Sequence, residues 1–506
     1  MGCSSKGREL KRELGVVLLT GIGIGGMVGA GAYINPGLMA SVAGPLSIVA
    51  IIFMGIISLL LAYIIAELGV IYPKAGTIHY FVKEILGDLA GFVTGLSYYA
   101  CCFVGTPAII YAFLFYLSYY VPGVAVGMTL TVWGIVIALI ILAIVTWINV
   151  IGIKYGAELN LILTVLRILP LVVFIAIAFT RFNISNFEPL APFGFRSLGL
   201  AVAFGFWMFL GFESIVLVSE EVKEPEKTIR ISAIMAIVIV ALIYTLNVLT
   251  FMGSINWNTL GFAEKDWAAV SKLSAPLADM SRTLGIPGLA EVLTFGAIVS
   301  TAGCFSAWVL IQGRVAFALA REERFWRPLA YVHPRYATPS HALIFSSILS
   351  AIIIVLIPSF PSVILMAMIT EVIPYAIAAL SIVVLRRNFK WALLGYIVFI
   401  ISSLYIYWGC WPWTLTGTAI AIASVILYPV FVKDTPYLSE LKKNTWYIIY
   451  LVGLTLISLL GDPMFVYENF LPISPLGIFP TPYDAIVIAI FTTIVFVWAY
   501  KAVQKK

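Results

Sequence analysis

A glycine-rich stretch near the N-terminus carries the residues best suited to hold a small charged molecule. Gly29 and Gly31 flank Ala30 inside an apolar run, and each glycine costs a helix about 1 kcal/mol relative to alanine, so we expect the helix to be interrupted there. Unwound backbone at membrane depth is tolerated only where it lines a cavity or is covered by protein. Its free N–H groups, at the start of the next half-helix, suit a carboxylate, which makes Met27, Gly29, Ala30 and Gly31 candidate substrate-binding residues. Gly21 and Gly25 fit a small-residue stripe for helix packing.

A second apolar run offers a matching weak point. Gly211 stands among the aromatic residues Trp207 and Phe209, and the carboxylate of Glu213 follows two residues later. An ionisable group inside an apolar span is a functional candidate by default. The two weak points fall in the first and sixth predicted spans, which are the first members of successive five-helix units. Interrupted helices at corresponding positions of two halves indicate a transporter binding site, to which we assign Trp207, Phe209 and Gly211.

Two more charged residues, Arg167 and Glu371, lie inside apolar runs. Arg167 either has a role in the bundle interior or extends its side chain toward the cytoplasmic interface. Glu371 lies nine residues into the run 362–385, about 13 Å along a helix, where an ionised carboxylate needs a partner. We hypothesise that proton coupling runs through Glu371. The alternative is an acid held neutral by a neighbouring hydroxyl or backbone group, with no transport role.

The elements that must position these residues are membrane-spanning helices. Of 506 residues, 62% are hydrophobic and only 11% are charged, and the mean hydropathy is +1.06. A soluble chain of this length needs a larger charged surface, so the fold class is an all-α polytopic membrane protein. Fourteen apolar runs are predicted to span: 15–34, 43–72, 89–120, 126–151, 157–180, 197–219, 231–253, 289–320, 341–358, 362–385, 391–409, 413–432, 445–461 and 484–500.

The placement of basic residues predicts the orientation. With the N-terminus inside, the outer loops hold five of the 30 lysines and arginines, and one more, Arg167, lies within a span. The remaining 24 fall in inner segments, which is a strong positive-inside bias. We therefore predict a multi-pass protein of the cell membrane with both termini cytoplasmic. The net charge of +6 follows from this topology and gives no reason to expect nucleic-acid binding.

Other chemistries find little support in the sequence. The five cysteines and three histidines show no metal-ligand spacing, so neither a metal nor a cofactor is predicted. An intramembrane hydrolase needs a nucleophile beside a base, and a channel needs a filter loop or a ring of like residues; neither is visible. A transporter rather than an enzyme is therefore predicted, with a solute sensor that does not transport as the alternative.

An ordered set of motifs resembles the amino acid–polyamine–organocation (APC) superfamily over about residues 10–388. The glycine-rich first helix, with its small-residue triad Gly29, Ala30 and Gly31, resembles that of the family. The other matching residues are Tyr63, Glu67, Leu68 and Gly69 followed by Pro73 and Gly76; Asn149, Gly152, Lys154, Ala157 and Asn160; Glu220 to Lys227; and Arg314, Ala320, Arg321 and Pro339. Thr77 departs from the family pattern, which has glycine or serine at that place.

The resemblance implies a leucine-transporter-like fold, a five-plus-five inverted repeat with broken helices 1 and 6. The chain would divide into a cytoplasmic tail (1–14), a first repeat (15–180), a second repeat (197–388), and about four extra helices with a cytoplasmic tail (391–506). In the family, backbone of the broken first helix holds the substrate carboxylate, and carbonyls of helices 1 and 6 hold its amine. The resemblance thus implies a secondary active permease or exchanger that moves amino acids or related amines by alternating access.

Roles for single residues also come from the resemblance. The sixth-helix run is similar to that of the bacterial arginine/agmatine antiporter, as is Trp308 in the eighth, which implies a gate made by Trp207 and Trp308 and a helix-linking role for Glu213. Ordinary membrane packing is the alternative for both tryptophans. Arg167 occupies a position where sodium-independent relatives carry lysine, so a fixed cation there would repel sodium. We expect a proton or a counter-substrate to be the coupled species, and we expect membrane lipid to surround the helices.

For the substrate, the sequence indicates a class of amino acid and not a particular one. The pocket candidates are aromatic or small, with no acid obviously aimed at a cationic side chain, which favours neutral or bulky apolar amino acids. They are Tyr98, Cys101, Cys102, Phe209 and Trp308. Uptake or exchange, proton coupling and oligomeric state stay open.

Overall fold

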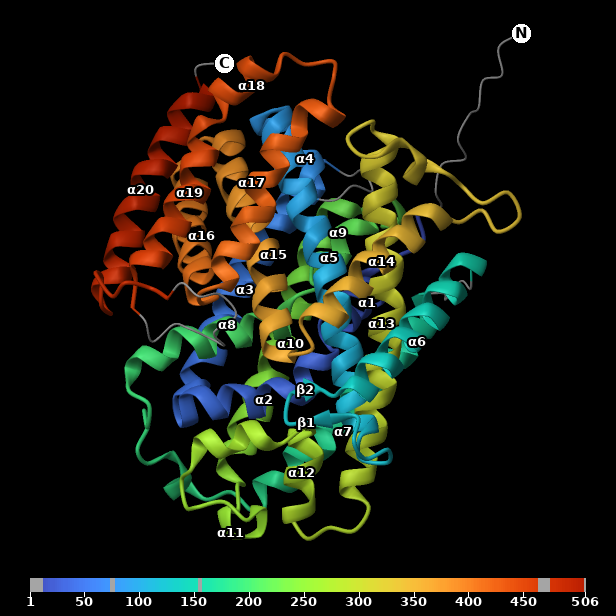
Figure 1. Cartoon of the computed structure of the whole chain (residues 1–506), viewed down its shortest axis with the longest axis vertical. Coiled ribbons are helices and arrows are strands. Elements are labelled where there is room, and N and C mark those ends of the chain that lie inside the picture. Colours follow the sequence, from blue (N-terminus) through green and yellow to red (C-terminus); the bar gives the residue numbers. More distant parts are fainter. Residues whose placement is uncertain (1–11, 73–77, 153–156, 463–473, 505–506) are drawn as a thin grey trace.

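The computed structural model describes residues 12–72, 78–152, 157–462 and 474–504. Most of the predicted tail 1–14 lies outside these residues, as do Pro73, Gly76, Thr77 and Lys154 of the family motifs. The described chain is a helical bundle with one small β-hairpin, and the helices run mostly along the long axis of the molecule (Figure 1).

The helices and strands fall into three groups along the chain. Up to residue 179 they are α1 (Val16–Met27), α2 (Ala30–Ala43), α3 (Ser47–Ile71), α4 (Ile78–Leu86), α5 (Asp88–Leu117), β1 (Ala125–Val126), β2 (Thr129–Leu130), α6 (Val132–Ile151) and α7 (Ala157–Phe179). The second group is α8 (Leu198–Phe209), α9 (Ser214–Leu217), α10 (Pro225–Gly253), α11 (Trp257–Leu260), α12 (Pro276–Thr283), α13 (Leu289–Arg321), α14 (Ser340–Leu356) and α15 (Phe360–Arg386). The third is α16 (Phe389–Trp408), α17 (Trp413–Phe431), α18 (Tyr437–Lys443), α19 (Thr445–Leu460) and α20 (Tyr483–Gln504).

Fewer than fourteen of the described helices are long enough to cross a membrane as single helices. Among the described residues, 11 helices are long and apolar enough to cross a membrane, or 12 if α18 and α19, which meet at 62°, form one span. The predicted spans 15–34 and 341–358 correspond to shorter apolar helices, α1 and α14, of 12 and 17 residues. The chain is nevertheless a multi-pass membrane protein, because so many long apolar helices cannot be covered in water.

The predicted span 126–151 begins later than expected. Thr131 caps α6, its hydroxyl accepting a hydrogen bond from the Gly134 N–H at 3.2 Å. The residues before it form the antiparallel hairpin β1–β2 instead of helix. Backbone bonds from Leu130 N–H to Pro358 O (2.9 Å) and from Phe360 N–H to Met128 O (3.0 Å) fix the hairpin against the start of α15.

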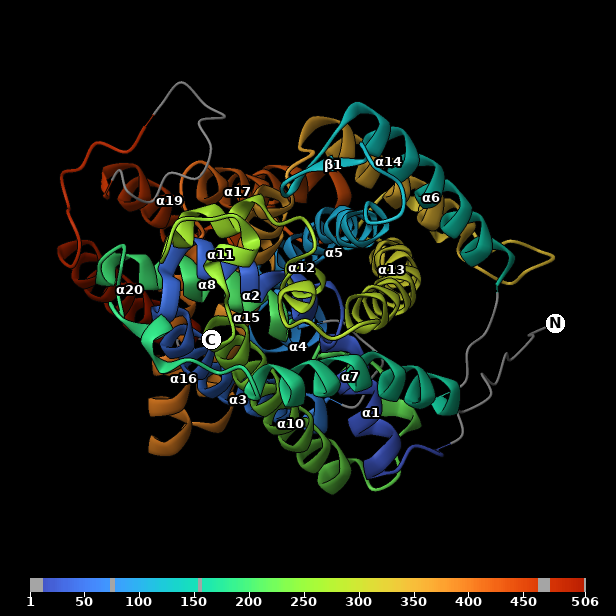
Figure 2. The same cartoon turned by 90° about the horizontal axis from the view of Figure 1, so that it is seen from below.

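Helix α15 lies at the centre of the bundle. Every residue from Phe360 to Val384 is buried, whereas α6 and α20 bury only a third of their most apolar windows. It packs against α5, α16 and α17, and α5 in turn packs against α13. The view along the bundle shows α15 surrounded by other helices, with α6 at the margin (Figure 2).

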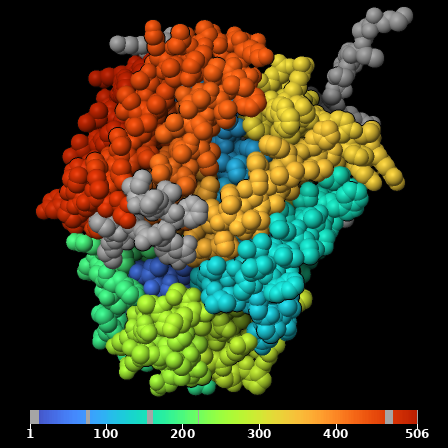
Figure 3. Space-filling model, viewed as in Figure 1, coloured from blue at the N-terminus to red at the C-terminus, as the bar shows by residue number. Residues whose placement is uncertain are grey.

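Segments that the charge distribution assigns to opposite sides of the membrane lie at opposite ends of the molecule. The hairpin, α11 and α12 lie in the lower half of Figure 1, with α11 at the bottom, and α4 and α18 lie in the upper part. The C-terminal helices, orange and red in Figure 3, cover one side of the upper half, where blue surface from the α4–α5 region remains visible beside them.

Helical structure is interrupted at both predicted weak points. Helix α1 ends at Met27 and α2 begins at Ala30, with Val28 in an extended conformation. Helix α8 ends at Phe209 and α9 begins at Ser214. Gly211 between them has φ +106°, a conformation that L side chains rarely adopt. The interpretation of both interruptions as breaks within single membrane-spanning helices, and the five-plus-five inverted repeat, stay predictions.

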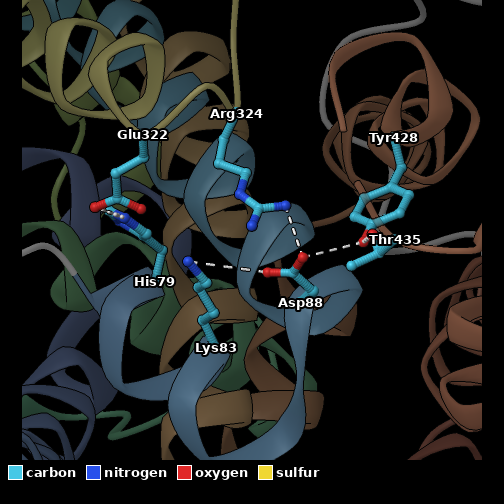
Figure 4. Close-up of polar contacts among 7 residues, drawn as sticks. All are labelled: His79, Lys83, Asp88, Glu322, Arg324, Tyr428 and Thr435. Atoms are coloured by element: carbon cyan, nitrogen blue, oxygen red, sulfur yellow. Dashed lines mark hydrogen bonds and ion pairs between the residues drawn. The ribbon is translucent and has the colours of Figure 1, made fainter. Parts of the chain in front are cut away.

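A cluster of ion pairs joins several helices at the upper end of the bundle (Figure 4). Arg324 Nη1 lies 2.6 Å from Asp88 Oδ2, and Lys83 Nζ lies 4.0 Å from the other oxygen of Asp88. Beside them, His79 Nε2 lies 3.4 Å from Glu322 Oε1. The hydrogen bond with His79 lowers the pKa of the Glu322 carboxyl below its ordinary value. These contacts hold the α4–α5 corner against the end of α13.

We predict that Glu322→Gln lowers the melting temperature measured by fluorescence in detergent at neutral pH. A carboxyl whose pKa is lower in the folded state stabilises that state above its unfolded pKa, and the stabilisation is lost as pH falls through the folded pKa. The difference between wild type and Glu322→Gln should therefore shrink as the pH falls below about 4.3.

Glu323→Gln is the matched control, because Glu323 is exposed and its oxygen lies 3.8 Å from Arg327 in a surface pair. It should melt as the wild type does at every pH. A difference between wild type and Glu322→Gln that stays constant down to the lowest pH would contradict the ion-pair explanation.

Candidate functional site

The interruption between α1 and α2 is surrounded by side chains that bind its backbone carbonyls. Ser300 Oγ of α13 donates to Val28 O at 3.3 Å. From α10, Tyr244 Oη donates to Met27 O at 2.9 Å. Asn247 Nδ2 donates at 2.7 Å to Ala32 O, a carbonyl within α2 that Pro36 leaves without its helical N–H partner. Inside a membrane, a carbonyl that has lost its helical hydrogen bond has no water to bind. Each such carbonyl left unpaired would cost roughly several kcal/mol. These polar side chains therefore make the interruption tolerable.

Arg167 on α7 belongs to the same set of donors. Its Nη1 lies 2.9 Å from Gly25 O, and its own carbonyl accepts a hydrogen bond from Tyr33 Oη at 2.7 Å. The residue is 3% exposed, so its guanidinium lies inside the bundle and does not extend to an interface. In the part of the chain that the structure describes, no acid pairs with it; its counter-charge is the carbonyl dipole at the end of α1.

The two interruptions touch each other. A Cβ atom on Gly26 would lie 2.5 Å from Gly211 O and 2.9 Å from Ser214 Oγ, and one on Gly211 would collide with the carbonyl of Gly26. Ser214 Oγ also donates to Ile22 O at 3.3 Å. The approach of the backbones is possible only because both positions are glycine. Any movement of one interruption must therefore displace the other.

An acidic pair lies beside the second interruption. Glu213 Oε2 accepts hydrogen bonds from Gly211 N–H (3.2 Å) and Tyr375 Oη (2.9 Å), and Tyr98 Oη lies 3.4 Å from Glu213 Oε1. Tyr375 Oη also lies 2.6 Å from Glu371 Oε1, whose second oxygen accepts from the Cys101 thiol at 2.7 Å. Glu213 thus contacts α5 and α15 as well as its own interruption, and Glu371 faces the bundle interior.

A cavity borders the end of α1, the second interruption and Glu213. It encloses about 470 Å³ of space free of protein atoms, including its opening. Its lining residues are Gly25, Gly26, Tyr98, Cys101, Cys102, Gly211, Glu213, Ser214, Leu217, Cys304, Ala307, Trp308 and Ile311. The wall is mostly apolar with a few polar groups, which is typical of a small-molecule site.

The structure brings some of the predicted site residues to this cavity and not others. Gly211, Glu213 and Trp308 line it, with Tyr98, Cys101 and Cys102. The lining does not include Met27, Gly29, Ala30, Gly31, Trp207 or Phe209, which lie next to it along the chain or behind its wall. Gly25, for which the sequence pattern indicated packing, and Gly26, to which no role was assigned, line the cavity instead. Glu213, predicted as a functional acid beside the second weak point, places its carboxyl on the cavity wall.

The two tryptophans predicted to form a gate are in contact. The ring centroids of Trp207 and Trp308 lie 5.9 Å apart, and both residues are buried. A Cβ on Gly105 of α5 would lie 2.9 Å from the Trp308 ring and 3.1 Å from the Trp207 ring. Gly105 therefore lets α5 approach the pair. Phe209 instead packs edge-on against Tyr244, with centroids 5.4 Å apart.

Sequence reasoning missed several of these partners. Tyr244, Asn247 and Ser300, which bind the interruption, went unnoticed, as did Tyr375 between the acids. A usable signal existed for two of them. Asn247 is a polar amide in an otherwise apolar run, and Tyr375 follows Glu371 by four residues, which places both on one helix face. Ser300 and Gly105 carry no such signal, because small residues are common in membrane helices.

A multi-pass helical bundle with paired interruptions beside an apolar cavity defines a class of membrane permease. The sequence comparisons identify the family: the family model described as amino acid permease matches residues 19–461, so the chain belongs to the amino acid permease family, within the predicted APC superfamily. Its relatives include the aspartate-proton symporter of Bacillus subtilis (strain 168), 27% identical over 98% of this chain and 97% of the relative.

Two further relatives from the same organism are similar over most of their length. The glutamate/serine transporter AimA is 26% identical over 98% of this chain and 94% of its own. The serine/threonine exchanger SteT is 27% identical over 75% of this chain and 85% of its own. These relatives are transporters, and the small molecules in their names are amino acids.

We predict that Gly31→Val abolishes substrate binding while the protein still inserts and folds. A Cβ on Gly31 would lie 3.1 Å from the Met208 backbone and 3.2 Å from the Trp207 ring, so the larger side chain pushes α2 away from α8. Overpacking of this kind costs about 1–3 kcal/mol. Binding is measured by thermal shift with amino acids, and folding by gel filtration.

The control is Gly15→Val, because no atom lies within 4 Å of a Cβ on Gly15. It should bind as the wild type does. Normal binding by Gly31→Val would show that the interruption is not part of the site.

Proposed function

We propose that this protein is a secondary transporter that carries amino acids or related amines across the cell membrane by alternating access, with both termini in the cytoplasm. The observation that supports it best is the cavity bordered at once by Gly25–Gly26, Gly211 and Trp308, so that both interruptions and the gate candidate meet at one space. The names of the relatives, which describe symport, exchange and transport of amino acids, favour the same function.

The backbone around the interruptions has the chemistry to bind an amino acid. The first N–H groups of α2, from Gly29 to Gly31, have no partner within their own helix and suit a carboxylate. The carbonyl end of α8 suits an ammonium group. In the proposed mechanism, movement of the Trp207–Trp308 pair extends the cavity from Gly26 to the start of α2, where the carboxylate binds.

Alternating access requires contacts that close one end and can be exchanged for others. A cluster of three charged residues is suited to closing one end in this way. In it, Glu67 pairs with both Arg230 of α10 and Arg386 of α15. Glu67 on α3 is itself buried. This cluster joins α3 to both later helices, so it must rearrange when α3 and α10 move relative to α15.

Transport is proposed to be independent of sodium. The guanidinium of Arg167 binds the Gly25 carbonyl, and it stays charged at every accessible pH. A sodium ion at the end of α1 would compete for the same carbonyl and meet a fixed positive charge nearby. The roughly 4 kcal/mol of repulsion expected for two charges 4 Å apart at a dielectric of 20 disfavours its binding.

The function is tested with purified protein in liposomes loaded with unlabelled aspartate, serine or leucine, measuring exchange for the same labelled amino acid. We predict saturable exchange for at least one of the three, at equal rates in sodium and choline buffers. Arg167→Ala should impair it by removing the tether between α7 and α1. An absence of exchange for the whole panel, with binding retained, would favour a sensor; loss of exchange in choline would contradict sodium independence alone.

We predict that Trp308→Leu changes the apparent affinity or the turnover at least tenfold, about 1.4 kcal/mol, with little change in protein abundance. The substitution removes the ring that contacts Trp207 and lines the cavity. Trp207→Leu should act in the same direction.

Trp133→Leu is the matched control, because Trp133 at the start of α6 is 73% exposed on the outside of the bundle. It should leave exchange unchanged. Equal losses of abundance and activity in Trp308→Leu would indicate packing instead of gating.

A further inference from the structure

Glu213 and Glu371 compete for the same hydroxyl group. Tyr375 Oη lies 2.9 Å from one carboxyl and 2.6 Å from the other, and a phenol has a single proton to donate. Both distances are those of hydrogen bonds, so the second contact needs a proton from the carboxyl itself. Two ionised carboxylates against one buried hydroxyl would leave two oxygens facing each other with no hydrogen between them.

The other donors decide which acid carries the extra proton. Glu213 also receives the Gly211 N–H and lies within 3.4 Å of the Tyr98 hydroxyl, so its ionised form is well supplied. Among the described residues, the donor that Glu371 has besides the shared Tyr375 hydroxyl is the thiol of Cys101, which is weak. Glu371 also lies within hydrogen-bonding reach of Glu213. We therefore infer that protonated Glu371 donates a hydrogen bond to Tyr375 Oη, and that the Tyr375 hydroxyl donates one to ionised Glu213.

Cations do not offset the charge of this pair. The titratable groups that face it are Tyr98, Cys101 and Cys102 on α5 and Tyr375 on α15. Among the described residues, no lysine, arginine or histidine forms an ion pair with Glu213 or Glu371. Buried like charges a few ångströms apart cannot both ionise cheaply, so one shared proton is the stable occupancy.

The two acids differ in access to the cavity. Glu213 lines it, whereas Glu371 is fully buried and does not. We propose that the two carboxyls and Tyr375 form a single binding site for the coupling proton, loaded through Glu213 and stored on Glu371. On release, the Tyr375 hydroxyl gives its proton to the Glu213 carboxylate while Tyr375 Oη takes the proton of Glu371, and loading is the reverse. One O–H bond forms at Glu213, one breaks at Glu371, and Tyr375 exchanges one for another, so the net charge of the site does not change during the transfer.

This site has a direct connection to the substrate cavity. The ionised Glu213 carboxylate holds the Gly211 N–H, and Gly211 packs on the Gly26 carbonyl. A charge-assisted hydrogen bond is roughly twice as strong as a neutral one, so protonation of Glu213 loosens its hold on the interruption. The proposal rests on the proposed transport function, and it identifies the coupled species as a proton.

The first test needs no substrate. Infrared spectroscopy of the purified protein at neutral pH should show the carbonyl band of a protonated carboxylic acid that is lost in Glu371→Gln and shifted in Tyr375→Phe. Asp484→Asn and Tyr407→Phe are matched controls, because Asp484 is a buried acid bound by the Tyr407 hydroxyl at 2.7 Å, far along the chain from this site. Neither control should remove the band. A band that survives in Glu371→Gln overturns the shared proton.

The second test compares gradient-driven uptake with exchange in liposomes, using aspartate, serine and leucine as probes. In the wild type an inward proton gradient of one pH unit should support accumulation up to about tenfold for one coupled proton. In Glu371→Gln the ratio of gradient-driven uptake to exchange should fall to the value measured without a pH gradient. In Asp484→Asn it should stay at the wild-type value. Wild-type exchange without any response to the gradient overturns the proton site alone, and absence of exchange overturns the proposed function with it.

Discussion

The organisation of this molecule depends on one constraint: a carbonyl released from a helix inside a membrane needs a hydrogen-bond donor from the protein. Where α1 stops at Met27, donors arrive from α7, α10 and α13. Each of these donors lies more than a hundred residues after α1 along the chain, so the interruption exists only once the bundle has assembled around it. The relative positions of these helices thus follow from the need to cover a few backbone atoms, and the cavity forms beside the place they cover.

The same constraint explains why charged residues gather there. Arg167 supplies a donor for Gly25 O that cannot lose its proton, and Glu213 supplies an acceptor for the Gly211 N–H. The positive group therefore belongs to the first interruption and the negative group to the second, and contact between Gly26 and Gly211 joins them. A neutral side chain could satisfy either backbone group. A charged one makes the geometry of the interruption sensitive to ions and protons, which is a property that a transporter can use.

The sequence predicts the positions of the functional residues better than it predicts which apolar runs form full-length helices. Glycines and ionisable residues inside apolar runs indicated the Gly29–Gly31 and Gly211 interruptions and singled out Arg167, Glu213 and Glu371, because these residue types are costly in a lipid-facing helix. Hydropathy, in contrast, measures composition and does not detect where backbone hydrogen bonding stops. It therefore assigned full spans to 15–34 and 341–358, where the structure has helices of 12 and 17 residues. The cavity lining was the least predictable part, because it depends on which faces of α1, α5 and α13 meet.

The complete burial of α15 has a consequence for how the protein is made. A helix with no lipid-facing side, from Phe360 to Val384, cannot remain for long as an isolated span next to acyl chains with an acid at its centre. During synthesis α5 already offers one wall, but α16 and α17 emerge only after α15 has entered the membrane. The C-terminal helices α16 and α17 then cover the remaining side of α15. A nascent chain that ends before them leaves uncovered the face of α15 that carries Ile369, against which Gly409 and Gly417 pack. Quality control should therefore recognise such a fragment by its uncovered central helix.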